Sequence, residues 1–242
     1  MTLLVAAAAA VLVFAVAAAA QAVTGFGMAL VAVPLMSVVI DPVAAVVSTT
    51  LVSLVLTGWA SVRERSTVER PVAARLVVAA LLGMPVGLVL LAELDEHLLK
   101  ALIAGVLLLL VLLLLAKVRL PGGGLSQWAS GVLSGAMLTS TGMNGPPVVL
   151  TLQALVLPPR RFRGTLQAVF CVQDLVAVVG FAVLGYLTPV IAVAALAGAL
   201  AVPVGWWAGD RVFARLLPER FRAVVLGMLA LTALVGLSTA LT

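Results

Sequence analysis

Two Gly-rich stretches interrupt long apolar segments and carry polar side chains suited to holding a small ligand. They are Thr24-Gly25-Phe26-Gly27 and, after Ser140, Thr141-Gly142-Met143-Asn144-Gly145-Pro146-Pro147. Glycine is entropically unfavourable in a helix and proline removes a backbone donor, so both stretches predict helix breaks. A helix that starts after a break presents free N–H groups and a partial positive charge, which attract anions. The breaks therefore predict a site for a small anion.

Asp174 is the acidic residue that lies deep in an apolar segment. An ionisable group at that depth is costly and indicates function. Gln167, Cys171 and Asp174 have the spacing i, i+4, i+7 and share one helix face. Because loss of water favours the neutral form of a carboxyl, Asp174 is a candidate proton-coupling residue. The alternative is a structural carboxyl bonded to Gln173 or to nearby backbone.

The segments that position these residues are long and apolar. The chain of 242 residues is 64% hydrophobic and 10% charged, whereas soluble domains are about one quarter charged. This composition excludes a soluble or disordered protein and predicts an all-α polytopic membrane protein. Segments 25–40 and 145–157 are too short for simple spans and are either half-membrane or re-entrant. The ten segments are 3–20, 25–40, 43–62, 71–91, 98–116, 125–141, 145–157, 163–182, 186–208 and 220–241.

The two halves of the chain repeat. Ile40-Asp41-Pro42 matches Leu157-Pro158-Pro159 at a shift of 117, and Met84-Pro85-Val86-Gly87 matches Val202-Pro203-Val204-Gly205 at 118. Each half has five segments, an odd number, so the second half is inverted, as in secondary transporters. We expect a first repeat over 1–116, a cytoplasmic linker over 117–124 and a second repeat over 125–242.

The same shift predicts where the two halves meet. It maps Gln167 and Asp174 onto Thr50 and Thr57, with Ser53 adjacent. Two related helices therefore carry polar stripes, which we expect to face each other across the internal two-fold axis. A repeat kept only for packing is the alternative. Tight helix packing is the preferred explanation for a further set of glycines, Gly83, Gly87, Gly131 and Gly135.

The basic residues fall on one set of loops. Lys100 lies on the other set, with Asp41, Glu93, Asp95 and Glu96. By the positive-inside rule the basic loops are cytoplasmic, which places both termini outside a plasma-membrane protein. This pattern also explains the net charge of +5 without nucleic acid. The remaining basic residues are Arg63, Arg65, Arg70, Arg75, Lys117, Arg119, Arg160, Arg161, Arg163, Arg211, Arg215, Arg220 and Arg222.

Other functional classes fit the residues less well. The chain has one histidine, His97, and one cysteine, Cys171. Neither a Ser–His pair, nor paired deep aspartates, nor a metal cluster can be assembled, so we predict no enzyme, no cofactor and no metal. A channel for small anions stays open as an alternative, because helix breaks also line selectivity filters.

The motif residues resemble those of the TauE/SafE family. The run from Thr24 to Leu35 is similar to the signature of its first repeat, and Gly142-Met143-Asn144-Gly145-Pro146-Pro147 to that of its second. The resemblance covers the whole chain and implies a membrane transporter, often an exporter, of sulfite, organosulfonates or related anions. Phe26, Met28, Met143 and Asn144 stand where many members have glycine.

The sequence thus predicts a secondary transporter for a small sulfur-containing oxyanion, embedded in the lipid bilayer and working by alternating access. Asp174 is the candidate for proton coupling. The predicted substrate-binding residues are Thr24, Gly25, Phe26, Gly27, Thr141, Gly142, Asn144, Gly145, Pro146 and Gln167.

Overall fold

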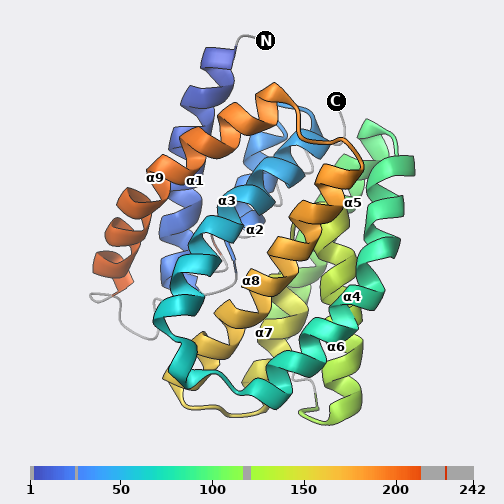
Figure 1. Ribbon diagram of the computed structural model, residues 1–242, viewed down its shortest axis with the longest axis vertical. Coiled ribbons are helices and arrows are strands. Elements are labelled where there is room, and N and C mark those ends of the chain that lie inside the picture. The colour runs from blue at the N-terminus through green and yellow to red at the C-terminus, as the bar shows by residue number, and fades with distance from the viewer. Residues whose placement is uncertain (1–2, 25–26, 117–120, 214–226, 228–242) are drawn as a thin grey trace.

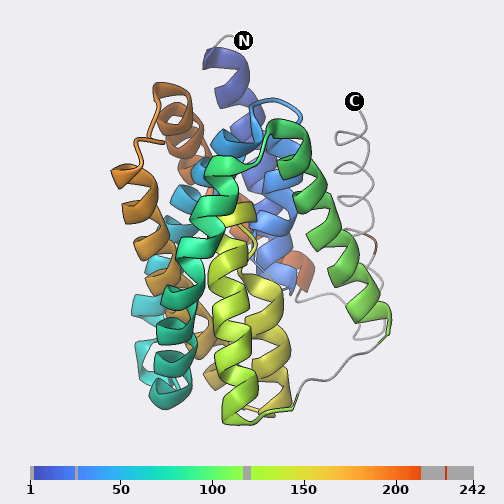
Figure 2. The same cartoon turned by 90° about the vertical axis from the view of Figure 1, so that its right-hand side faces the viewer.

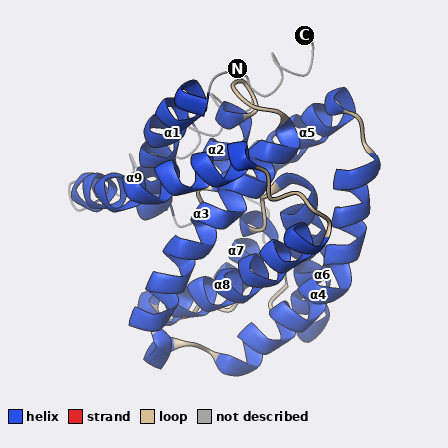
Figure 3. Ribbon diagram, turned by 45° about the horizontal axis from the view of Figure 1, so that its top comes forward, coloured by secondary structure: helices blue, strands red, loops and turns tan. Residues whose placement is uncertain are grey.

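The computed structural model describes residues 3–24, 27–116, 121–213 and 227 (Figure 1). These residues form nine α-helices and one short 3-10 helix, and no strand occurs among them (Figure 3). Six of the helices are long and apolar enough to cross a membrane. The all-helical fold is therefore confirmed for these residues, and six helices have the length and apolarity that the predicted polytopic membrane protein requires. The predicted segment 220–241 lies outside the described residues, apart from Gly227.

The helices match the predicted segments in order. Several starts are fixed locally: prolines occupy the first turns of α3, α4 and α8, and Asp41 caps α3 by accepting a hydrogen bond from the Ala44 N–H at 2.9 Å. The helices are α1 Leu3–Thr24, α2 Ala29–Met36, α3 Pro42–Arg63, α4 Arg70–Glu93, α5 Glu96–Leu115, α6 Gly124–Thr141, α7 Gly145–Ala154, α8 Pro159–Val183 and α9 Pro189–Phe213, with η1 at Arg65–Thr67.

Two helices are too short to cross a membrane. α2 has 8 residues and α7 has 10, so they are about 12 and 15 Å long, against a hydrocarbon core of about 30 Å. α2 packs against α1 and leads the chain back to the end of the molecule where α1 begins, and α7 does the same beside α6 at the opposite end (Figures 1 and 2). The chain therefore reverses direction at each of these short helices, as either a half-membrane or a re-entrant segment requires.

Glycines let two helix pairs approach closely. α4 lies along α6, and α1 lies along α9. A Cβ atom added to Gly135 would overlap the carbonyl oxygen of Ala80, and one added to Gly205 would overlap that of Ala15. Small residues at such contacts are typical of helix packing in membranes. The packing role predicted for the glycines of α4 and α6 is confirmed.

Charged residues separate towards the two ends of the helix bundle. The turn over 64–69 and the start of α8 lie together at the lower end in Figure 1, joined by ion pairs from Arg161 to Glu69 and from Arg163 to Glu64. The loops over 94–95 and 184–188 lie at the upper end. The turn over 64–69 and the start of α8, which the charge pattern groups together, thus lie at one end, and the two loops of the other group lie at the opposite end.

Candidate functional site

A buried polar cluster surrounds Asp174, near the centre of α8. The carboxyl oxygen Oδ2 accepts a hydrogen bond from the hydroxyl of Ser53 on α3 at 2.8 Å. The Thr57 hydroxyl, also on α3, lies 3.1 Å from Oδ2 and 2.9 Å from the Ser53 carbonyl oxygen, and donates its one proton to one of them at a time. Oδ1 accepts a longer bond from Nδ2 of Asn144 at 3.5 Å. Asp174 is 1% exposed, and no Lys or Arg of the described residues forms an ion pair with it. Polar positions of α3 and α8 therefore meet, together with the second helix break.

Asn144 connects the cluster to Gln173 and, through Ser134, to α6. Its Nδ2 also donates to Oε1 of Gln173 at 3.1 Å. The hydroxyl of Ser134 lies 3.1 Å from the same Oε1 and 2.9 Å from the Asn144 carbonyl oxygen. A hydroxyl has one proton, so Ser134 donates to one of these acceptors at a time. Asp174 and Gln173 are thus linked through Asn144, and the direct bond between them considered from the sequence is not formed.

Several buried polar groups have no partner within the described part of the chain. They include Nε2 of Gln173, Oε1 of Gln167, both amide atoms of Gln21 and the Thr49 hydroxyl. Leaving such a group unpaired costs about 1–3 kcal/mol. A polar ligand that bonded to them would recover this free energy. Gln167 is among the predicted residues, whereas Gln21, Thr49 and Gln173 were not predicted to bind.

The second break has a defined geometry. Gly142 ends α6 in the left-handed conformation, with φ +74°, and its N–H donates to the Leu138 carbonyl at 2.8 Å. All residues from Thr141 to Pro147 are buried. A Cβ atom on Gly142 would lie 3.1 Å from Val33 Cγ2, so α2 closes over this break. In this conformation the second break is not open to solvent.

The start of α7 offers fewer donors than a helix terminus usually does. Pro146 and Pro147 have no N–H, so only Gly145 of the first three residues keeps one. The hydroxyl of Thr141 donates to its own helix, at the Met137 carbonyl, at 2.8 Å. The side-chain amide of Asn144 adds a donor at the second break, and it is the one aimed at Asp174.

The first break is described in part. Thr24 is the last residue of α1 and Gly27 has φ +95°, in the left-handed region that favours glycine. The predicted contacts of the Thr24 side chain, Gly25 and Phe26 lie outside the described residues. α2, unlike α7, has no proline in its first turn, so its early residues all carry an N–H.

The remaining candidate groups are the one cysteine and possible metal ligands. Cys171 is a free, half-buried thiol. Across residues 3–24, 27–116 and 121–213, no three His, Cys, Asp or Glu side chains are grouped so that they could hold a metal ion.

Comparison with known proteins identifies the family. Residues 10–236 match the family described as sulfite exporter TauE/SafE. Searches among curated proteins and among solved structures each gave no match. The family match spans nearly the whole chain, and it agrees with the six long apolar helices of a multi-pass membrane protein. The chain therefore belongs to the TauE/SafE family of membrane transporters, for which sulfite or a related small anion is the implied substrate.

Proposed function

We propose that this protein moves a small sulfur-containing oxyanion, such as sulfite or a sulfonate, across the cytoplasmic membrane by alternating access. The observation that carries the proposal is the buried cluster in which Asn144, at a helix break, contacts Asp174. The cluster combines neutral donors, among them the unpaired Nε2 of Gln173, with a carboxyl that has no cationic partner among the described residues. Neutral donors can hold an anion at the membrane centre without a buried lysine.

Alternating access would follow from an internal two-fold axis, which we infer from the repeat shift. The Thr57 hydroxyl lies 3.1 Å from Oδ2 of Asp174, and the two residues are separated by 117 positions, which equals the repeat shift. Residues related by a two-fold axis meet only near that axis. The repeat also maps α1 onto α6 and α9 onto α4, and both resulting pairs, α1 with α9 and α6 with α4, pack closely. We therefore propose inverted repeats over 1–116 and 125–242, joined by a linker over 117–124.

The two re-entrant hairpins fit this arrangement. They enter from opposite ends of the molecule (Figures 1 and 2), as paired interrupted helices do in inverted-repeat transporters. The end that carries Arg63, Arg161 and Arg163 is proposed to be cytoplasmic. The N-terminus then lies outside, and with ten segments the C-terminus lies outside too.

The position of Asp174 suggests how protons enter the cycle. An ionised carboxylate beside Asn144 repels an anion held by the same amide, and protonation removes that repulsion. Binding of proton and anion would therefore favour each other, and this coupling is reciprocal. We propose Asp174 as the proton site, and the two breaks with Gln167 as the anion site. A channel for small anions is the alternative.

Replacing Asn144 by alanine tests the site directly. We expect Asn144→Ala to lower saturable sulfite flux in proteoliposomes by at least about tenfold, equivalent to about 1.4 kcal/mol. The protein should still fold, because hydrogen bonds in membrane proteins contribute only about 1 kcal/mol each. Ser140→Ala is the matched control, since the Ser140 hydroxyl donates to the Ala136 carbonyl of its own helix. Wild-type flux in a folded Asn144→Ala protein would contradict the site.

A further inference from the structure

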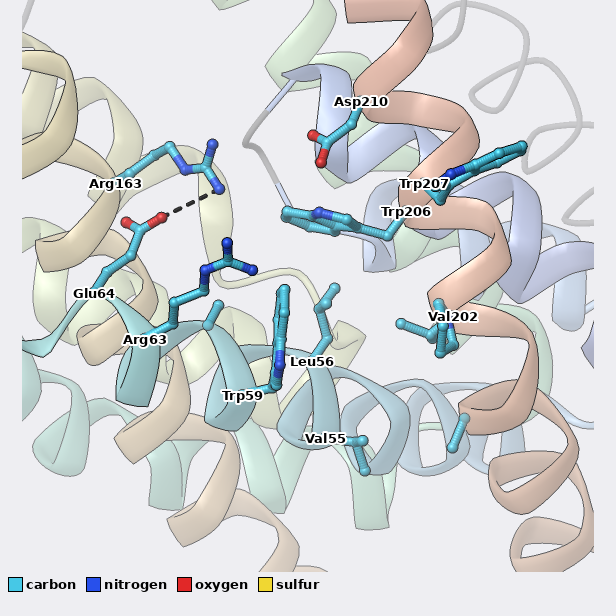
Figure 4. Close-up of a pocket in the computed structure, with 13 residues that line it drawn as sticks. Val55, Leu56, Trp59, Arg63, Glu64, Arg163, Val202, Trp206, Trp207 and Asp210 are labelled. Atoms are coloured by element: carbon cyan, nitrogen blue, oxygen red, sulfur yellow. Dashed lines mark ion pairs between the residues drawn. The ribbon is translucent and has the colours of Figure 1, made fainter.

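A cavity of about 730 Å³ lies between α3, the start of α8 and α9 (Figure 4). It is separate from the cluster at Asp174, whose members do not line it. Ligand pockets commonly have volumes of about 300–1,000 Å³. The cavity is therefore large enough for an organic ligand of moderate size, and its lining indicates which kind.

The charged side chains of the cavity gather at one end. They are Arg63 and Glu64 at the end of α3, Arg163 at the start of α8 and Asp210 near the end of α9. Arg163 pairs with Glu64 at 3.2 Å. Arg63 and Asp210 form no ion pair with any described residue, and both side chains are directed towards the cavity in Figure 4. The charged end thus offers one guanidinium and one carboxylate to a ligand.

The opposite end of the cavity is apolar and lies deeper in the bundle. Val55 and Leu56 on α3 and Val202 on α9 line it. Val55 precedes Arg63 by two helical turns, a distance of about 12 Å along the axis. One leaflet of the hydrocarbon core is about 15 Å thick, half of the full core. With Arg63 at the membrane surface, the cavity would run from the charged end of the helices to roughly the middle of the bilayer.

Aromatic side chains mark the boundary between the two ends. The rings of Trp59 and Trp206 pack edge to face with centroids 6.3 Å apart, and the Arg63 guanidinium lies 5.4 Å above the Trp59 ring. Tryptophan concentrates at the membrane–water interface. Val55 and Trp59 are also about half exposed, at 55% and 52%, so this side of α3 is accessible from the lipid.

We propose that this cavity binds a zwitterionic phospholipid of the phosphatidylethanolamine type. Its phosphate would bind Arg63, its ammonium group would bind Asp210 beside the Trp206 ring, and an acyl chain would lie against Val55 and Val202. Basic pockets between membrane helices bind anionic lipid headgroups, whereas here the added carboxylate of Asp210 favours a headgroup of zero net charge. The proposal is independent of the transport function.

Lipid titration of the purified full chain, followed by native mass spectrometry, tests this assignment. The probes are dioleoyl phosphatidylethanolamine and dioleoyl phosphatidylglycerol. Wild-type protein should prefer the ethanolamine lipid, and Arg63→Gln should weaken its binding about three- to fivefold, the scale of an exposed ion pair. Asp210→Asn should reverse the preference towards the glycerol lipid, because the cavity gains net positive charge. Arg65→Gln, an exposed arginine outside the cavity, is the matched control.

Three results would overturn the proposal. If the wild type binds both lipids equally, and Asp210→Asn does not change this, a zwitterionic site is excluded. If Arg63→Gln binds the ethanolamine lipid as tightly as the wild type does, this cavity is not the binding site. Competition by soluble glycerophosphoethanolamine as strong as that by the lipid would show that the site recognises a free headgroup and not a membrane lipid.

Discussion

Replacing Asp174 by asparagine should make transport insensitive to a pH gradient. Asparagine keeps the size of the side chain and can still accept from Ser53 and Thr57 through its carbonyl oxygen, but it cannot take up a proton. In proteoliposomes, an inwardly directed proton gradient should raise uptake of a short alkyl sulfonate by the wild type. The Asp174→Asn protein should show no such increase. The sulfonate is the better probe here, because its single negative charge does not change near neutral pH, whereas sulfite changes there between a singly and a doubly charged anion.

A matched acidic variant makes this result specific. Glu93→Gln removes a carboxyl that is exposed at the end of α4 and has no hydrogen bond or ion pair with a described side chain. Its response to the gradient should equal that of the wild type. If Asp174→Asn keeps the full response, Asp174 has no part in proton coupling. Its role is then structural, holding α3 to α8 through Ser53 and Thr57.

Replacing Gly135 by leucine should prevent folding. A side chain at this position would occupy the space of the Ala80 carbonyl on α4. Backbone cannot move away as the end of a flexible side chain can, so the helices must separate. We expect a cost of about 3 kcal/mol or more, at the upper end for overpacked cores. The measurement is the yield of monodisperse protein in size-exclusion chromatography and its thermal unfolding midpoint.

Gly105 in α5 provides the control for that experiment. It is exposed, and a Cβ atom built on it meets nothing within 4 Å. Gly105→Leu should therefore be neutral or stabilise the helix slightly, by up to about 1 kcal/mol from helix propensity. A Gly135→Leu protein as stable as the Gly105→Leu protein would show that α4 and α6 do not pack as closely as described.

The order of the helices was predictable because each membrane crossing requires a long apolar run. The ends of the helices were less predictable, because an apolar run shows which residues lie in the membrane, whereas the helix can begin or end outside that run. Segment 163–182 became α8, Pro159–Val183, which starts before the apolar run because a proline is favourable in a first helical turn. Segment 25–40 shortened to α2, Ala29–Met36, since Gly27 adopts a left-handed conformation and the chain turns after Met36.

The part of the candidate site that lies between α3 and α8 was predictable from the repeat shift. That shift placed Thr57 opposite Asp174, and the hydrogen bond between them follows. Ser134 was missed because it lies between Gly131 and Gly135, in a pattern typical of helix packing. Gln21 and Thr49 were missed because single polar residues in apolar segments carry no spacing signal. The donors expected at the start of α7 are few, because Pro146 and Pro147 lack an N–H.

Counterflow in liposomes tests the central claim, that this protein is a carrier for a small sulfur-containing oxyanion. Vesicles containing purified protein would be loaded with unlabelled sulfite or a short alkyl sulfonate and diluted into labelled anion at low concentration. A carrier exchanges the two pools, so the label should accumulate transiently inside and the rate should saturate with anion concentration. Flux that rises linearly with concentration, without transient accumulation and with insertion of the protein verified, would contradict the carrier and identify a channel.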